Sequence, residues 1–542
     1  MNKIIISTLF LFIFNYCASF SDDRVQAILP EFKAYIQKVM KDWQMPAVSV
    51  GIVYQGKVVF EEAMGVKSVD TQEPVDIHTS FPIASCTKTF LSALLAQLVD
   101  EGKIKWKDPV RQYLPTFFIG NEEVSQVFTL EDLVSHQSGL PSFSGDTFWE
   151  LGFSQQELLD SLAKVPLKRP FKEFYGYQNH LFSVASLVAE KVTGKKIEEL
   201  FTERFFMPLH MDDASASYEK MIPESWWQRL LNYRSDRGIT GWLFPRKQVN
   251  AIAPHTFIQG KITTIPFPKE LYLFPGTSGV NASISDMNKW LLFQLKNMNQ
   301  EGGPKISTAE VERLRTPHIS ILGLKPTDSQ FPPSRYTNVA YGIGWFIHDI
   351  GVEGKKVHAF GHMGGFSSVR SLILIVPEQQ LGIVILSNLG GLRVNMALEA
   401  LREKFMDLFL KIDDGTDWST KNLDKIKEMQ ESYKRELGAM RLQNPRPMRE
   451  LKLYEGKFKN NLYGTLVVEA KGQQLVFKIR DKVVPVKHWN GDQFLFDAPD
   501  LSAAYSSNDV GVLEFGFQKQ SKAMVLAINM LREGDQLFER FE

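Results

Sequence analysis

The sequence predicts an α+β fold in which an antiparallel sheet is flanked by helices and carries an inserted helical lobe, followed by a small all-β barrel. Strand-like segments lie near both ends of the first 412 residues, with a long helix-rich stretch between them. Short strand-like segments bounded by turn residues fill the rest of the chain from about residue 449. We therefore expect a signal peptide at 1–19, a main domain at 22–412, a charged helical linker at 413–448 and a barrel at 449–542.

The main domain should begin with a helix and a hairpin. The pattern of 25–43 is helical, and two strand-like runs then meet at the turn Gln55-Gly56. Strands and a closing helix return near the end of the domain. The expected elements are strands at Val48–Tyr54, Lys57–Ala63, Ser371–Pro377 and Leu381–Asn388 and a helix at Val394–Leu410.

The linker and the barrel differ in composition. The charged, helix-prone stretch KNLDKIKEMQESYKREL is followed by Pro445 and Pro447, through which no regular helix continues. The segments beyond are short and rich in β-forming residues, which indicates an all-β module. The expected strands are GTLVVEA, QQLVFKI, KVVPVKHW, QFLFD and MVLAINM.

The N-terminal segment has the order of a secretory signal. Lys3 precedes an apolar run at 4–14, and the small residues Ala18 and Ser19 follow it. The run is shorter than the about 20 apolar residues that cross a membrane. We therefore expect export to the periplasm or to the medium.

The two cysteines, Cys17 and Cys86, limit the lipidation and the disulfides that are possible. Tyr16 precedes Cys17, where a lipoprotein signal would carry a small residue, so we favour cleavage without lipidation. Cleavage beyond Cys17 leaves Cys86 alone, and an intrachain disulfide is then excluded.

The composition and the net charge limit the classes of molecule that the protein is expected to bind. Lys and Arg total 62 and Asp and Glu total 62, so no net field attracts nucleic acid or an anionic membrane. The histidines show no metal-ligand spacing and no glycine-rich loop is suited to phosphate, so we expect neither metal nor cofactor. A small-molecule or peptide substrate is the default expectation.

The most informative segment is FPIASCTKTFLSALLAQLVDEGKI. Ser85 lies at the start of its helical run and Lys88 follows three residues later, so hydroxyl and amine share one helix face. The positive end of the helix dipole favours a developing alkoxide and a neutral lysine. Alone, however, Ser-x-x-Lys is common and equally describes a helix cap beside a solvated lysine.

An ordered series of further motifs decides between these two interpretations. Together with Ser85 and Lys88, the series resembles the serine β-lactamase and penicillin-binding-protein superfamily, and it is most similar to the class C-like branch with its D-aminopeptidases and esterases. The resemblance covers about 25–410, and the segment from about 449 onward resembles a lipocalin-like β-barrel. The motifs are, in order, TLEDLVSHQSGLP, YGYQN, LVAEKVTGKKIEELFTERFFMPLHM, FPGTSGVNASISDMNKW, YGIGW and GHMGG.

The resemblance implies roles for two residues of the YGYQN motif. Tyr177 matches the tyrosine that faces the Ser-Lys pair, where a phenol near two cationic groups loses its proton more easily and relays it. Asn179 would donate its amide to the substrate carbonyl. Tyr175 competes for the role of Tyr177 but lacks the asparagine at the right spacing, and packing explains it better.

The family's third element is represented by His362-Met363-Gly364. Its glycines would let substrate lie along the strand edge, with His362 and Gly364 in contact with it, and the amides of Ser85 and Gly365 would form the oxyanion hole. Where relatives carry Lys-Thr-Gly, histidine and Met363 weaken the grip on a substrate carboxylate. Esters, amides or D-amino-acid peptides therefore fit better than penicillin.

Other reactive residues have simpler explanations. His136 fits a structural role in the SHQSGLP loop, and Ser138 lacks the G-x-S-x-G elbow of a triad nucleophile. Asp286 is suited to capping the helix at Asn288–Leu295, and Cys86 to a small buried core position. The aromatic residues at 226–244 fit equally an acyl-binding wall or simple packing.

The resemblance thus implies an exported serine hydrolase that forms an acyl-enzyme on an ester, an amide or a D-amino-acid peptide. One alternative is a penicillin-binding protein or weak β-lactamase. Another is a non-catalytic assembly or sensor protein that keeps the fold, although retention of Ser85, Lys88, Tyr177 and Asn179 argues against it. In relatives the barrel caps the cleft or mediates assembly, so a homo-oligomer formed through it is a further hypothesis.

Overall fold

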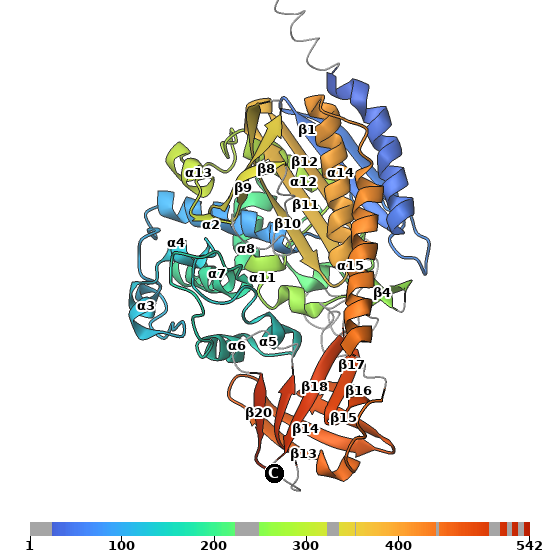
Figure 1. Ribbon diagram of the computed structural model, residues 1–542. Coiled ribbons are helices and arrows are strands. Elements are labelled where there is room, and N and C mark those ends of the chain that lie inside the picture. Colours follow the sequence, from blue (N-terminus) through green and yellow to red (C-terminus); the bar gives the residue numbers. More distant parts are fainter. Residues whose placement is uncertain are drawn as a thin grey trace, which may run out of the picture.

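The computed structural model describes residues 24–222, 249–258, 260–321, 335–352, 354–440, 444–497, 510–517, 523–528 and 536–542. The predicted signal peptide at 1–19 and the aromatic residues at 226–244 lie outside these ranges. Within them, the structure confirms the predicted fold class. Figure 1 shows an antiparallel sheet with helices around it, a helical lobe beside it and a separate β-barrel that carries the C-terminus.

The main sheet has eight strands, and every pairing in it is antiparallel. The first hairpin pairs through β1 with the last strand of the domain, so the two ends of the domain close one sheet. In spatial order the strands are β2 (Lys57–Gly65), β1 (Ala47–Tyr54), β12 (Leu381–Ser387), β11 (Val369–Val376), β10 (Lys355–Phe366), β9 (Phe346–Val352), β8 (Tyr336–Tyr341) and β7 (Ile319–Ser320).

The hairpin turn between β1 and β2 follows from its two residues. Gln55 and Gly56 have φ angles of 48° and 75°, which are the left-handed values that a two-residue hairpin turn requires. Glycine adopts such a value without steric cost, and this explains why the predicted strands are joined at this point.

Helices cover both faces of the central strands, which are therefore buried along their whole length. Helix α12 (Ile284–Leu295) packs on β1 and β12, where Gly51 and Gly382 leave room for its side chains. Helix α14 (Leu392–Leu410) packs on β11, and a helix spans 24–43. Asp286 completes a capping box with Ser283, so α12 begins four residues earlier than predicted.

The lobe between β3 (Phe81–Pro82) and the late strands is mostly helical. Its helices carry or adjoin the residues that the sequence motifs single out. They are α2 (Thr87–Asp100), α3 (Glu122–Val127), α4 (Leu130–Leu133), α5 (Asp146–Glu150), α6 (Gln155–Leu162), α7 (Asn179–Thr193), α8 (Ile197–Phe201), α11 (Pro275–Ser278) and α13 (Thr308–Leu314), with short strands β4 (His255–Ile258), β5 (Lys261–Thr264) and β6 (Asn281–Ala282).

The predicted linker contains a long helix, α15 (Trp418–Met440), whose start packs on α14. The indole of Trp418 donates to Asp407 at 2.5 Å, and the hydroxyl of the buried Ser419 donates to Asp42 at 2.7 Å. Figure 1 shows α15 running from the main domain toward the barrel.

The barrel is closed by eight antiparallel strands in chain order. It docks on the helical lobe, because the ring centroid of Tyr463 lies 5.2 Å from that of Phe148 on α5 and Arg480 donates to Glu157 on α6. The strands are β13 (Gly456–Asn460), β14 (Gly464–Lys471), β15 (Gln474–Ile479), β16 (Lys482–Asn490), β17 (Gln493–Asp497), β18 (Val510–Phe517), β19 (Ala523–Ile528) and β20 (Leu537–Arg540).

None of the helices in the described ranges combines the length and the apolarity that crossing a membrane requires.

Candidate active site

Ser85 lies in a 3-10 turn, Ala84–Cys86, immediately before helix α2. Ala84 has a φ of 45°, an uncommon value for a residue with a side chain and a form of local strain often found at functional sites. Ser85 itself is partly exposed, whereas most of α2 is buried. A partly exposed hydroxyl is thus held at the positive end of a buried helix.

Lys88 is fully buried and faces three oxygen atoms. Its Nζ lies 2.9 Å from the Oγ of Ser85, 2.8 Å from the Oδ1 of Asn179 and 3.4 Å from the carbonyl oxygen of Thr277. These partners come from the turn before α2, from the start of α7 and from α11. Three separate motifs of the sequence therefore meet at one amine.

Burial lowers the pKa of Lys88 to about 7, because desolvation disfavours the ammonium form. The negative charge of Asp146 acts in the opposite direction and raises the pKa of Lys88. A substantial fraction of Lys88 is therefore neutral near neutral pH.

The neutral amine fits the three oxygens in one way. It has two N–H donors and one lone pair, and the carbonyl oxygens of Asn179 and Thr277 accept but cannot donate. Both donors are then used, and the lone pair remains for the hydroxyl of Ser85, 2.9 Å away. The amine is therefore oriented to accept the proton of Ser85.

Asp146 fixes the orientation of Asn179. The Nδ2 of Asn179 donates to the two carboxylate oxygens of Asp146 at 3.0 and 3.1 Å, which leaves Oδ1 facing Lys88. The sequence prediction assigned this amide to a substrate carbonyl, and in the structure it is bound to Asp146. No sequence motif singled out Asp146, which is 33 residues from Asn179 in the chain.

Tyr177 adjoins the same pair of residues. Its side chain is hydrogen-bonded to Ser85, and the Nζ of Lys88 lies 5.1 Å from the centroid of its ring. Burial raises the pKa of Tyr177 far above its usual value of 10, and the hydrogen bond to Ser85 only partly offsets this. The neighbouring cationic groups predicted a more acidic phenol, but complete burial outweighs the nearby amine. Tyr177 is therefore protonated and can donate a proton.

Strand β10 runs beside the Ser85 turn and carries the His362-Met363-Gly364 motif. The thiol of Cys86 donates to the carbonyl of His362 at 3.5 Å, and the hydroxyl of Ser371 on β11 donates to the carbonyl of Ile83 at 2.6 Å. A Cβ on Gly364 would lie 2.1 Å from that same carbonyl oxygen. Only glycine therefore lets the strand approach the turn this closely.

His362 is buried, and both of its ring nitrogens have partners in the protein. Nδ1 lies 2.7 Å from the carbonyl oxygen of Met363, which can only accept, so Nδ1 carries the proton. Burial lowers the pKa of His362 to about 3, so Nε2 accepts from the hydroxyl of Tyr341 at 3.1 Å. The predicted substrate contact of His362 would have to replace one of these hydrogen bonds.

His136 cannot serve as a base for a neighbouring serine. Its Nδ1 accepts from the backbone N–H of Gln178 at 3.0 Å, and burial holds its pKa well below 6.5. The proton of the neutral ring is therefore on Nε2, which leaves no free lone pair. Ser138 accepts from the N–H of Leu140 at 3.3 Å, as expected of a loop residue.

Burial also raises the pKa of Cys86 to about 12, so its thiol is not activated.

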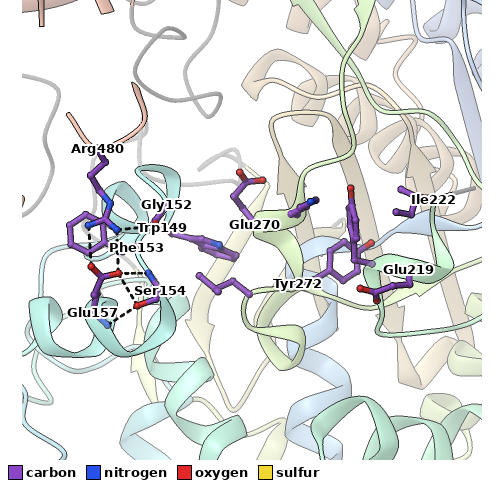
Figure 2. Close-up of a pocket in the computed structure, with 13 residues that line it drawn as sticks. Trp149, Gly152, Phe153, Ser154, Glu157, Glu219, Ile222, Glu270, Tyr272 and Arg480 are labelled. Carbon is purple, nitrogen blue, oxygen red and sulfur yellow. Dashed lines mark hydrogen bonds and ion pairs between the residues drawn. The ribbon is translucent and has the colours of Figure 1, made fainter. Parts of the chain in front are cut away.

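A cavity of about 830 Å³ lies between the helical lobe and the barrel. Figure 2 shows Trp149 of α5 in its wall, with Arg480 and Glu157 at one side and Glu219 at the other. The ring of Trp149 lies 6.1 Å from that of Phe366, which directly follows Gly365 on β10. One wall of the cavity thus contacts the end of β10. No sequence motif indicated it, because its walls come from both domains.

Within the described ranges, no group of three or more His, Cys, Asp or Glu side chains is placed to hold a metal ion.

The comparisons with known families agree with this geometry. The family model described as Beta-lactamase matches residues 32–404, which include every residue of the site described above except those of the barrel. The chain belongs to the Beta-lactamase family. A second model, described as a domain of unknown function (DUF3471), matches residues 441–540, which include all eight strands of the barrel.

Among curated relatives of this Beta-lactamase family member, Protein flp of Staphylococcus aureus is 23% identical over 374 residues, 69% of this chain and 65% of that protein. The chain thus matches just under two thirds of the length of Protein flp. The unguisins hydrolase ungD′ of Aspergillus campestris is 25% identical over 457 residues, 82% of this chain and 77% of that protein.

Solved structures share the fold of the whole chain. An octameric penicillin-binding protein homologue from Pyrococcus abyssi has a TM-score of 0.56 and 19% identity, and the alignment covers 94% of this chain and 100% of that one. The crystal structure of SurE has a TM-score of 0.51 and 17% identity, with 97% and 100% covered. The β-lactamase fold followed by a barrel is therefore shared with known structures.

Proposed function

We propose that this member of the Beta-lactamase family is an exported serine hydrolase that cleaves an ester, an amide or a D-amino-acid peptide through an acyl-enzyme. One observation carries the proposal: the amine of Lys88 lies 2.9 Å from the hydroxyl of Ser85, in a buried position that lowers its pKa to about 7.

In the proposed reaction, Lys88 takes the proton of Ser85 as the Oγ attacks the substrate carbonyl and a C–O bond forms. The carbonyl electron pair moves to oxygen and returns when the bond to the leaving group breaks. Lys88 then gives its proton to the leaving group, with Tyr177 as the relay, since its phenol is protonated and hydrogen-bonded to Ser85. Water hydrolyses the acyl-enzyme by the reverse route and restores Ser85.

The backbone of β10 supports the proposed oxyanion hole. The hairpin between β10 and β11 turns through two residues, so Phe366 and Val369 form the hydrogen-bonded pair that closes it. Because such pairs alternate along antiparallel strands, the N–H of Gly365 faces away from β11. Pairing with β9 stops at Gly361, so among the described residues this N–H has no strand partner and can act with that of Ser85 on a developing oxyanion.

The substrate class follows from the strand motif and from the relatives. His362 is neutral and bound on both sides, and Met363 has no hydroxyl, so neither side chain is suited to grip a free carboxylate. Two curated relatives are named unguisins hydrolases. A neutral ester or a peptide without a terminal carboxylate at the scissile bond therefore fits better than a penicillin.

The experiment combines covalent labelling with a substrate panel. The protein is treated with a fluorophosphonate probe and the modified peptide is mapped by mass spectrometry. We expect modification of Ser85, and turnover of short-chain esters or D-aminoacyl anilides that exceeds turnover of a chromogenic cephalosporin. Labelling of another serine contradicts the mechanism. Preferential cephalosporin turnover would identify a β-lactamase instead, and labelling without turnover of any compound would identify a non-catalytic relative.

The pKa of Lys88 predicts the pH dependence of the reaction. The base must be neutral, so kcat/KM for p-nitrophenyl acetate should rise with pH and level off above about 7. Below this value it should fall about tenfold per pH unit, following the neutral fraction of the amine. Since Asp146 raises the pKa of Lys88, Asp146→Asn should move the rise to lower pH. A rise near or above pH 10 would indicate the Tyr177 phenolate as the base.

A further inference from the structure

The cavity between lobe and barrel has the size of a ligand site. Its volume of about 830 Å³ lies within the range of about 300–1,000 Å³ that is typical of small-molecule pockets. Its walls come from α5, from the loop between α5 and α6, from the turn before α11, and from Arg480 of the barrel. Among the described residues, the barrel contributes Arg480 to a wall that otherwise comes from the main domain.

Aromatic rings form much of the wall. Trp149, Phe153, Tyr218 and Tyr272 line the cavity together with Leu273. The wall already binds cations through ring faces: the guanidinium carbon of Arg480 lies 4.2 Å from the centroid of Phe153, and the Nζ of Lys269 lies 5.5 Å from that of Tyr218. Such a surface accepts an apolar group and tolerates a positive charge beside it.

Among the described residues that line the cavity, three carry carboxylates, and two of these interact with basic side chains. Glu157 accepts two hydrogen bonds of 3.2 Å from Arg480. Lys269 helps to lower the pKa of Glu219, which also accepts from the hydroxyl of Ser217 at 2.6 Å. Among the described residues, the partly buried side chain of Glu270 has no hydrogen bond or ion pair. Figure 2 shows Glu270 between the other two carboxylates.

Helix α5 joins the cavity to the reacting pair. Trp149 in the cavity wall and Asp146 belong to the same helical turn. Three hydrogen bonds in series, each between 2.8 and 3.1 Å, connect Asp146 through Asn179 and Lys88 to Ser85. Helix α5 therefore carries both a residue of the cavity wall and the carboxylate that orients Asn179.

We propose that this cavity binds the part of the substrate remote from the scissile carbonyl, and that it selects an aromatic or long apolar group carrying a positive charge, with Glu270 as the counter-ion. The inference rests on the proposed hydrolase function for its biological meaning. The binding event itself needs no catalysis and can be measured separately.

The test uses phenylbutylamine and phenylbutanol, which share an apolar body and differ in charge. Their affinities for the full-length Ser85→Ala protein are measured by calorimetry at low ionic strength and neutral pH. We expect the amine to bind about threefold to tenfold more tightly than the alcohol, as one partly exposed charge pair with aromatic support allows. Glu270→Gln should remove the preference while leaving the affinity for the alcohol unchanged.

Glu301→Gln is the matched control, because Glu301 is exposed and does not line the cavity. It should retain the full preference, and all three proteins should share one melting temperature. Equal binding of amine and alcohol, failure of both to bind, or a preference that survives Glu270→Gln would each overturn the proposal. The hydrolase function fails separately, when the probe does not label Ser85 although the charge preference is present.

Discussion

Ser85→Ala is expected to lower kcat/KM for a short ester by about ten-thousandfold or more, since loss of the nucleophile from a catalytic unit costs a serine hydrolase between about 10⁴ and 10⁶. The hydroxyl of Ser85 accepts the acyl group as an ester that water can hydrolyse, whereas the amine of Lys88 would form a stable amide. The rates of wild type and variant are compared with p-nitrophenyl acetate, with purified protein at equal concentration.

Loss of labelling by the fluorophosphonate probe should accompany the loss of rate. Ser138→Ala is the matched control, because Ser138 is the serine that a rival triad with His136 would use. It should keep both the rate and the labelling, provided that its melting temperature matches wild type. A Ser85→Ala protein that keeps more than about a tenth of the rate would show that another group performs the chemistry.

The sequence predicted the elements of the site better than their interactions. Ser85 lies in the 3-10 turn that leads into α2 and Lys88 lies in the first turn of α2, so a spacing of three residues already places them together. Asn179 and Thr277 reach Lys88 from distant segments, and only the order of motifs indicated that they would converge. Asp146 was missed because its role arises from the packing of α5 against α7, which no local pattern encodes.

Burial explains where the predicted chemistry and the structure differ. The pKa of Tyr177 was expected to fall beside cationic groups, but the phenol is enclosed by His136, Phe143 and Phe346 and its pKa rises. His362 was assigned to substrate, yet hydrogen bonds inside the protein hold both of its nitrogens. Whether the pKa of such a group rises or falls depends on how far it is removed from water, and the sequence alone does not give this burial.

For the barrel, too, the sequence predicted strands but not their contacts with the main domain. Turn residues and β-forming residues predicted five of its strands as segments, which correspond to β14, β15, β16, β17 and β19. Its contact with α5 and α6 depends on Tyr463 and Arg480, which carry no signal in their own sequence context. The cavity that the two domains share could therefore be found only from the structure.

Lys88→Met is expected to lower kcat/KM for the same ester by between about a hundredfold and ten-thousandfold, the range in which general bases contribute. Methionine keeps the length and the apolar stem of lysine but has no amine, so Ser85 loses its proton acceptor. Removal of the amine also leaves the carbonyl oxygens of Asn179 and Thr277 without this donor, so the melting temperature is measured in parallel.

Lys88→Arg separates the proton acceptor from the positive charge. The guanidinium stays charged at every accessible pH and therefore cannot take the proton of Ser85, although it can donate to the same oxygens. Both variants should be similarly slow, and both should lose the rise in rate near pH 7 that the amine confers. If Lys88→Arg instead kept the wild-type rate and pH profile, the charge and not the lone pair of Lys88 would be what activates Ser85.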